Sequence, residues 1–177
     1  MKPMTDFIAL LRGINVGGHR KLRMADLRAI CAALDLKNAR TYLQSGNLRF
    51  SADADCDHAA RLEAAICDSI GCDVRVALLL ADDFAAMAAT NPFIGQVGVD
   101  PAHLHLTVLI SPTVVIPESL APPVAGDEIV AYGSRCIYLH CPHGYGRTKL
   151  TNAWFERAIG DCVTTRNWRT VTAICDL

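Results

Sequence analysis

Basic residues gather where three segments of helical periodicity are expected to begin. These stretches are residues 19–23, 147–149 and 164–167. The start of a helix carries partial positive charge and unpaired N–H groups, so acidic residues are ordinarily favoured there. A bound anion reverses that preference, because N–H, hydroxyl and guanidinium groups can converge on it. The three stretches therefore predict an anion-binding site. Side chains that reach into solvent or pair with acids elsewhere are the alternative.

The charge along the chain is strongly asymmetric, although the net charge is only −1. Residues 1–50 carry nine Lys/Arg and three acids, or +6, and residues 134–177 carry six and three, or +3. Residues 51–133 carry two Lys/Arg and twelve acids, a net charge of −10. This pattern indicates an anionic partner for the two ends. Basic ends that face the acidic middle within the fold explain it equally well.

Other site chemistries find little support in the residue spacing. The glycine-bearing loop at 13–18 matches neither nucleotide-binding fingerprint, although Arg12 and Asn15 flank its turn and are candidate ligand contacts. His103 and His105 would share a strand face about 6–7 Å apart, but such a pair more often faces solvent. Ser45 does not lie in a nucleophile elbow. We expect no metal and no cofactor, and the sequence does not decide whether the protein is an enzyme.

The sequence lacks the features of exported or membrane proteins. No apolar run approaches the roughly 20 residues that cross a bilayer, and the first residues do not resemble a signal peptide. None of the eight cysteines forms a C-x-x-C pair. Cys31, Cys67 and Cys175 fall on apolar positions of expected helices, where a free thiol behaves as a small hydrophobe. We therefore expect a cytoplasmic protein with no membrane contact.

The first half of the chain must position the N-terminal candidates through alternating strands and helices. Apolar runs and helical periodicity predict a strand, a helix, a hairpin with its turn at Ser45-Gly46, a helix capped by Asp57, and a final strand. Their expected ranges are 7–11, 24–36, 40–44, 48–50, about 57–70 and 74–80. This β-α-β-β-α-β order is that of a ferredoxin-like fold.

The second half is predicted to be a looser α+β arrangement. Asp82 and Asp83 open an alanine-rich helix. A half-buried strand, a proline-containing connection, a hairpin and two helices follow, at 103–110, 112–126, 129–132 with 136–140, 150–159 and 167–175. The order loosely echoes the first half, which favours pseudo-duplication. We expect an α+β protein with a ferredoxin-like subdomain at 1–81 and a second α+β subdomain at 82–177 packed against it.

Four segments resemble a bacterial family, domain of unknown function 1697. They are residues 7–18 (FIALLRGINVGG), 41–47 (TYLQSGN), 148–152 (TKLTN) and 164–168 (TTRNW). Together they span nearly the whole chain in order, with a loose match from about residue 92 to 125. The resemblance implies an α+β fold with ferredoxin-like subdomains and implies no activity. The cysteines and the stretch from 140 to 143 do not look like family features, which weakens a metal role.

Polar residues inside these four segments form the predicted site. They are Arg12, Asn15, Ser45, Asn47, Lys149, Asn152, Arg166 and Asn167. If they meet in space, they bind a phosphorylated or carboxylated small molecule, such as a nucleotide-like ligand, in a basic cleft formed by the two chain ends. In a transferase or hydrolase, Lys149 or Arg166 would stabilise developing negative charge.

Two other functions stay open from the sequence. A nucleic-acid-binding module would use the same basic residues for backbone phosphates, which is the less favoured prediction. A structural or partner-binding protein without a catalytic site would use the motifs for hairpin turns and helix caps. The oligomeric state is left undecided.

Overall fold

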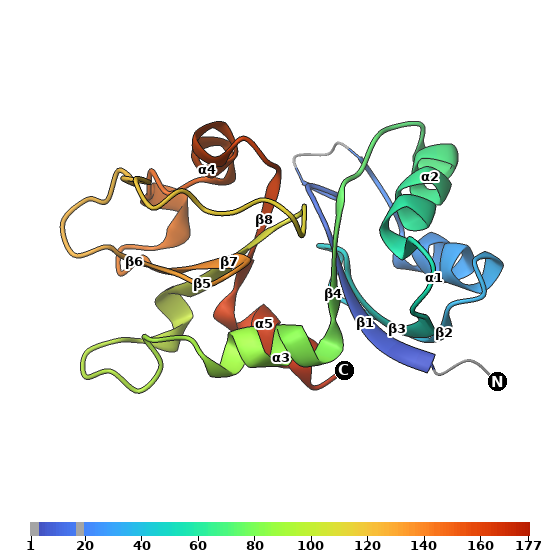
Figure 1. Ribbon diagram of the computed structural model, residues 1–177, viewed down its shortest axis with the longest axis horizontal. Coiled ribbons are helices and arrows are strands. Elements are labelled where there is room, and N and C mark those ends of the chain that lie inside the picture. The colour runs from blue at the N-terminus through green and yellow to red at the C-terminus, as the bar shows by residue number, and fades with distance from the viewer. Residues whose placement is uncertain (1–3, 17–19) are drawn as a thin grey trace. The chain divides into compact units, whose positions relative to one another are not determined.

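The computed structural model describes residues 4–16 and 20–177. The chain divides into two compact units, residues 1–85 together with 173–177, and residues 86–172. In the described residues each unit contains a four-stranded sheet whose neighbouring strands are all antiparallel (Figure 1). The predicted α+β class is therefore confirmed.

The first unit has the predicted element order. It contains β1 (Met4–Leu11), α1 (Met24–Ala33), β2 (Lys37–Tyr42), β3 (Asn47–Asp53), α2 (His58–Ile70) and β4 (Val76–Leu80). The strands lie in the order β2-β3-β1-β4, and α1 and α2 lie on the same side of the sheet (Figure 1). The end of β1 lies beside the start of β3, because Leu10 is opposite Asn47.

Alternation along the strands builds the core of the first unit. In β1, Phe7 and Leu11 face the helices and pack in one cluster with Leu48 and Phe50 of β3. The helix α2 begins as predicted, because the Asp57 carboxylate accepts a hydrogen bond from the Ala60 N–H at 3.0 Å. These contacts fix the sheet that carries the N-terminal candidate residues.

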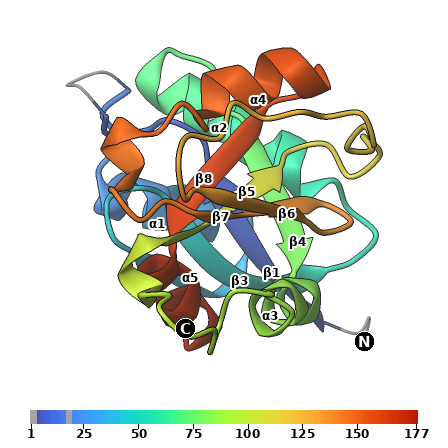
Figure 2. The ribbon, with the colours of Figure 1, turned by 90° about the vertical axis from the view of Figure 1, so that its left-hand side faces the viewer.

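The second unit has an extra strand that the sequence did not predict. After α3 (Ala81–Ala89) come η1 (Pro101–His103), β5 (Leu104–Leu109), β6 (Ile129–Tyr132), β7 (Cys136–His140), η2 (Tyr145–Arg147), α4 (Asn152–Ile159), β8 (Val163–Asn167) and α5 (Trp168–Cys175). The hairpin of β6 and β7 has the predicted bounds. The strand order is β6-β7-β5-β8, and α4 lies on one side of this sheet (Figure 2).

Residues 164–167 were predicted to start the last helix, and that prediction is wrong. They belong to β8, which pairs antiparallel with β5 so that Thr165 lies opposite Thr107 and Arg166 opposite Leu106. Threonine is favoured in strands because its branched side chain packs well on a pleated surface. The helix α5 begins only at Trp168.

The strand β5 is buried along its whole length, whereas alternation predicted a half-buried strand. Two of its polar side chains contact residues of the same unit. The His105 ring stacks on Tyr145 with centroids 4.7 Å apart, and the Thr107 and Thr165 hydroxyls lie 2.7 Å apart. His103 lies in η1 and not in the strand, so the predicted pairing of His103 and His105 on one strand face is wrong.

The two sheets follow one strand order. Each unit places its third strand beside its first and its fourth strand on the other side of the first. Residues 110–128 stand where the first unit has α1, and they contain neither a helix nor a strand. Among the described residues, no helix has the length and apolar character needed to cross a bilayer.

Candidate functional site

The side chain of Asn15 holds the loop after β1 to the turn between β2 and β3. Its amide nitrogen donates to the main-chain oxygens of Leu22 at 2.9 Å and Gln44 at 2.7 Å. Its oxygen accepts from the Leu22 N–H at 3.0 Å. Asn15 has φ of 55°, a left-handed conformation that asparagine tolerates better than most residues. The residue therefore shapes the loop through its side chain.

The turn between β2 and β3 packs directly on the end of β1. The Leu11 N–H donates to the Gly46 oxygen at 2.8 Å. Gly46 has φ of +77°, and a β-carbon there would lie 2.7 Å from both Leu11 Cβ and Ile14 Cδ1. Only glycine fits that conformation and that close approach. The first two motif segments are therefore in contact with each other.

Asn47 is fully buried in this turn. Its amide donates to the Tyr42 oxygen at 2.8 Å and to the Ser45 hydroxyl at 3.0 Å. Ser45 itself is exposed. Asn47 therefore closes the hairpin, which is a structural role, while Ser45 lies at the surface beside it.

A pocket of about 360 Å³ opens at the start of α1. It is lined by Asn15, Lys21, Leu22, Arg23, Met24 and Gln44. Arg23 is the N-terminal cap residue of α1, and its side chain makes no capping hydrogen bond to the helix. The pocket thus combines the positive end of a helix with two cationic side chains.

Arg23 is paired with an acid of its own helix. Its Nε and Nη2 atoms donate to the two oxygens of Asp26, both at 2.8 Å. These hydrogen bonds hold the pKa of Asp26 below its ordinary value. Within the described part of the chain no ion pair involves Lys21. Lys21 is therefore the uncompensated charge of this pocket.

Arg12 lies directly after β1 and is half-buried. Its main-chain N–H donates to the Arg75 oxygen at 2.9 Å, next to the β1–β4 pair. Arg12 does not line the pocket at α1. The structure brings Asn15, Ser45 and Asn47 together around one loop and turn, with Asn15 alone among the predicted residues facing this pocket.

The four C-terminal candidates lie in the second unit, and two of them meet at Thr165. The Thr165 hydroxyl donates to the Asn152 side-chain oxygen at 2.5 Å. The Thr165 main-chain oxygen accepts from Arg166 Nη1 at 3.0 Å, and the same nitrogen donates to the Thr164 hydroxyl at 2.8 Å. Arg166 is buried in β8, and its burial lowers the pKa of the guanidinium to about 10.

Lys149 and Asn167 have separate positions in the second unit. Lys149 is exposed and precedes α4, whose first turn is capped by the Thr151 hydroxyl through the Trp154 N–H at 3.2 Å. Asn167 ends β8, and its side-chain oxygen accepts from the Thr170 N–H at 2.8 Å in the first turn of α5. The basic stretch at 147–149 does precede α4, although the cap of that helix is Thr151 and not a cation. The stretch at 164–167 lies in β8, and Asn167 caps α5.

The chain matches a sequence family and resembles a known structure. Residues 4–138 match the family described as protein of unknown function DUF1697. The chain belongs to this family. The conserved bacterial protein SP0830 from Streptococcus pneumoniae has a similar structure, with a TM-score of 0.74, 24% sequence identity and 98% of each chain covered. At this identity the likeness supports the fold alone. No curated protein matches the chain.

Sequence reasoning selected only Asn15 among the lining residues of the pocket in this DUF1697 protein, and it missed three polar ones, Lys21, Arg23 and Gln44. Lys21 and Arg23 stood in the first basic stretch, and Gln44 directly precedes Ser45, but none of the three was selected as a site residue. Gln44 lines the pocket beside the hydrogen bond that its main-chain oxygen accepts from the Asn15 amide. No local pattern reveals that contact, whereas the basic stretch did point to Lys21.

The described residues contain no group of three His, Cys, Asp or Glu side chains placed to hold a metal ion. His140 and Cys141 are buried, and His143 is exposed, 3.0 Å from the Asp127 carboxylate. The side chains of the α1 pocket offer electrostatic attraction and hydrogen bonding to a ligand.

Proposed function

We propose that this protein binds a phosphorylated or carboxylated small molecule in the pocket at the start of α1. The observation that carries the proposal is the coincidence of an open pocket of about 360 Å³ with Lys21, Arg23 and a helix N-terminus that lacks a side-chain cap. Helix N-termini favour anions, and cationic side chains beside them strengthen that preference.

The charges around the pocket support an anionic ligand in two ways. Lys21 has no ion-pair partner among the described residues, so its charge is available to a ligand. The Arg23–Asp26 pair lies at the surface, with 81% of the Arg23 side chain exposed. Exposed ion pairs contribute little to stability, so a phosphate can recruit Arg23 at little cost.

The hydrogen bonds of Asn15 support binding by preorganising the pocket. They join the loop, Leu22 and the β2–β3 turn before any ligand arrives. A preformed site binds more tightly because less conformational entropy is lost on association. The pocket is near the lower end of the roughly 300–1,000 Å³ of small-molecule sites, which suits a mononucleotide or a sugar phosphate.

The test is a thermal-shift screen of the full chain against mononucleotides, sugar phosphates, dicarboxylates and short oligonucleotides at constant ionic strength. A ligand that binds only the folded state raises the melting temperature in proportion to its saturation. We expect stabilisation by a mononucleotide or sugar phosphate, and we expect Lys21→Gln to weaken it about tenfold, since a charge-assisted hydrogen bond contributes about 1.5–3 kcal/mol.

Lys37→Gln is the matched control for Lys21→Gln. Lys37 is an exposed lysine of the same unit that pairs with Asp35 and does not line the pocket. It should leave the ligand response unchanged. An equal loss in both variants would show that only the net charge matters and would remove the pocket from the proposal. Stabilisation by oligonucleotides alone, with steep salt dependence, would instead favour a nucleic-acid-binding module.

Lys149 was also selected from the sequence, and it is exposed before α4 in the second unit. Lys149→Ala therefore belongs in the same screen. Arg166→Ala is unsuited to it, because Arg166 is buried and hydrogen-bonded within β8, so the change would lower stability before it tested binding.

We also infer a ferredoxin-like topology for the first unit and a looser copy of it in the second. The β-α-β-β-α-β order and the strand order β2-β3-β1-β4 support the first inference. The order β6-β7-β5-β8, with helices after the third and fourth strands, supports the second. Nuclear Overhauser contacts between Phe7 and Leu80 and between Thr107 and Thr165 test the two central pairings.

A cytoplasmic location is part of the same proposal. All eight cysteines, which lie in described residues, are free thiols. Free thiols are typical of the reducing cytoplasm, whereas small exported domains tend to pair them. Cell fractionation with a periplasmic marker checks this, and a protein found in the periplasmic fraction would refute it.

A further inference from the structure

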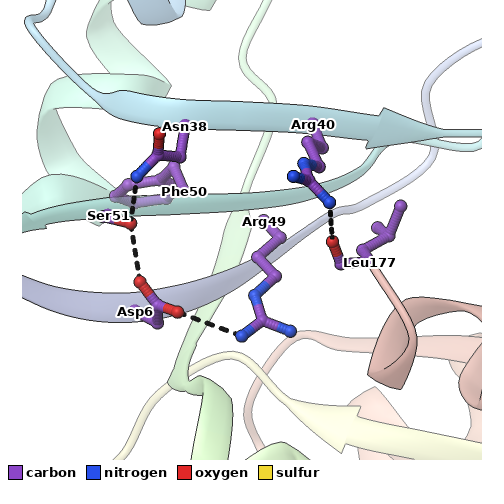
Figure 3. Close-up of a pocket in the computed structure, with 7 residues that line it drawn as sticks. All are labelled: Asp6, Asn38, Arg40, Arg49, Phe50, Ser51 and Leu177. Carbon is purple, nitrogen blue, oxygen red and sulfur yellow. Dashed lines mark hydrogen bonds and ion pairs between the residues drawn. The ribbon is translucent and has the colours of Figure 1, made fainter.

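A second pocket of about 430 Å³ lies in the first unit on strands β1, β2 and β3 (Figure 3). It is lined by Asp6, Asn38, Arg40, Arg49, Phe50, Ser51 and Leu177. None of these residues lines the pocket at α1. The sequence did not predict it, because its members come from three strands and from residue 177.

A hydrogen-bond network fixes the acidic side of this second pocket. The Ser51 hydroxyl donates to Asp6 at 2.6 Å, and Arg49 Nη2 donates to the other Asp6 oxygen at 3.0 Å. Asn38 donates to the Ser51 hydroxyl at 3.3 Å. The bond from Ser51, and then the one from Arg49, hold the pKa of Asp6 below its ordinary value. Asp6 is therefore an ionised acceptor in a fixed position.

The basic side of the second pocket consists of two arginines on neighbouring strands. Arg40 and Arg49 are directly opposite each other in the pairing of β2 with β3. Like charges at opposed positions destabilise a sheet. Arg49 forms an ion pair with Asp6, whereas Arg40 donates to the main-chain oxygen of Leu177 at 2.7 Å. No Asp or Glu side chain in residues 4–16 and 20–177 forms an ion pair with Arg40.

Arg40 and Asp6 have more hydrogen-bond donors and acceptors than the bonds of the second pocket use. A guanidinium has five N–H donors, and a carboxylate has about four acceptor positions. Arg40 and Asp6 use one donor and two acceptor positions in the bonds described above. Donors from Arg40 and Arg49 are thus available for an anionic group, and acceptors of Asp6 for hydroxyl groups.

We propose that this second pocket binds a hydroxylated organic anion of the sugar phosphate or sugar acid class. Its phosphate or carboxylate would lie between Arg40 and Arg49, where it relieves the repulsion of the two opposed cations. Its hydroxyl groups would donate to Asp6. The ionised Asp6 repels an anionic group close to it, so a ligand whose hydroxyl donors lie apart from its charged group is preferred over inorganic phosphate.

The test is an isotope-edited NMR titration of the full chain with glucose 6-phosphate, inorganic phosphate and glucose at constant ionic strength. We expect glucose 6-phosphate to shift the amide signals of Asn38, Arg40 and Ser51 and to bind at least about tenfold more tightly than inorganic phosphate, since one hydrogen bond to a charged group corresponds to that factor or more. Glucose should not shift these signals.

Two variants test the roles of Arg40 and Asp6, and a third, Arg157→Gln, is the control. Arg40→Gln should weaken glucose 6-phosphate binding about tenfold or more. Asp6→Asn keeps the size of the side chain and removes the repulsion, so it should tighten inorganic phosphate binding and narrow the preference for glucose 6-phosphate. Arg157→Gln changes an arginine in the last turn of α4 and should leave binding unchanged.

The outcome separates this site from the pocket at α1. Lys21→Gln should leave the shifts of Asn38 and Ser51 unaltered even if binding at α1 is lost. Shifts confined to residues around α1 would overturn the second site and leave the first intact. Unchanged glucose 6-phosphate binding in Arg40→Gln would also overturn the second site. The same holds if neither glucose 6-phosphate nor inorganic phosphate shifts the signals of the pocket residues, since Leu177 would then occupy Arg40 fully.

Discussion

Asn15 and Gln44 are 29 residues apart, and the Asn15 side-chain amide donates to the Gln44 main-chain oxygen at 2.7 Å. With its two bonds to Leu22, this contact ties the loop after β1 to the turn between β2 and β3. The relationship gives Asn15 a role in shaping the α1 pocket that is separate from any direct contact with a ligand.

Asn15→Ala should lower the free energy of unfolding by about 1–3 kcal/mol. The change removes three hydrogen bonds and places alanine at φ of 55°, which is unfavourable for a residue with a β-carbon. Denaturant unfolding measures the loss. Asn15→Gly removes the same bonds without the backbone strain, so it should be milder, and equal losses would show that strain plays no part.

Gly46→Ala should be clearly more destabilising than Gly71→Ala in the same unit. Both glycines have positive φ, +77° and +67°, so alanine at either position costs about 1–2 kcal/mol of backbone strain. Only at Gly46 does the new β-carbon also meet Leu11 and Ile14 at 2.7 Å, which adds about 1–3 kcal/mol of overpacking. Paired denaturation curves provide the comparison. Equal losses would mean that the turn moves away from β1 freely.

Thr165→Val should lower the stability of the second unit by about 1–3 kcal/mol. The Thr165 hydroxyl lies between the Thr107 hydroxyl and the Asn152 oxygen, and valine leaves both without this partner. Thr113→Val makes the same replacement at an exposed threonine and should change stability by less than about 0.5 kcal/mol. Similar effects of the two changes would argue that the contact of Thr165 with Asn152 is not formed in solution.

His105 should make the protein less stable as the pH falls from 7 toward 5. Burial lowers the pKa of His105 from 6.5, and the ring stacks on Tyr145. The folded protein therefore binds fewer protons than the unfolded chain just below pH 6.5, so stability rises with pH there and is lost as the pH falls toward the lower pKa of the folded state. An NMR titration of the His105 ring, with unfolding curves at each pH, measures both quantities.

His105→Phe keeps an aromatic ring against Tyr145 and removes the titrating group. Its stability should depend less on pH between 5 and 7 than that of the parent protein. A pKa at or above 6.5 for His105 in the parent would contradict the sign of this prediction.

The parts of the fold that local patterns specify were predicted well. The hairpin of β6 and β7 has its predicted bounds because two apolar runs flank a short glycine turn. Asp57 and Gly160 stand at the predicted ends of helices for local reasons as well, since capping depends on a few neighbouring residues. Such features need no knowledge of the rest of the chain.

The parts that depend on distant partners were not predictable in the same way. Val163–Asn167 contains two threonines, an arginine and an asparagine, and only pairing with β5 makes it a strand. His105 and Thr107 give β5 the pattern of a half-exposed strand, yet Tyr145 and Thr165 cover them. The same limit applied to the site, where Asn47 was selected for its polarity and proves to be a buried hairpin residue.

The first unit is assembled from two stretches of chain that synthesis separates widely. Arg40 and Leu177 are in contact at a separation of 137 residues, and the whole of residues 86–172 is made between them. On the ribosome, β1 to β4 can pair long before residues 173–177 emerge. During that interval Arg40 lacks its hydrogen bond to Leu177. In a nascent chain the Arg40 guanidinium on this face of the sheet is therefore open to other partners.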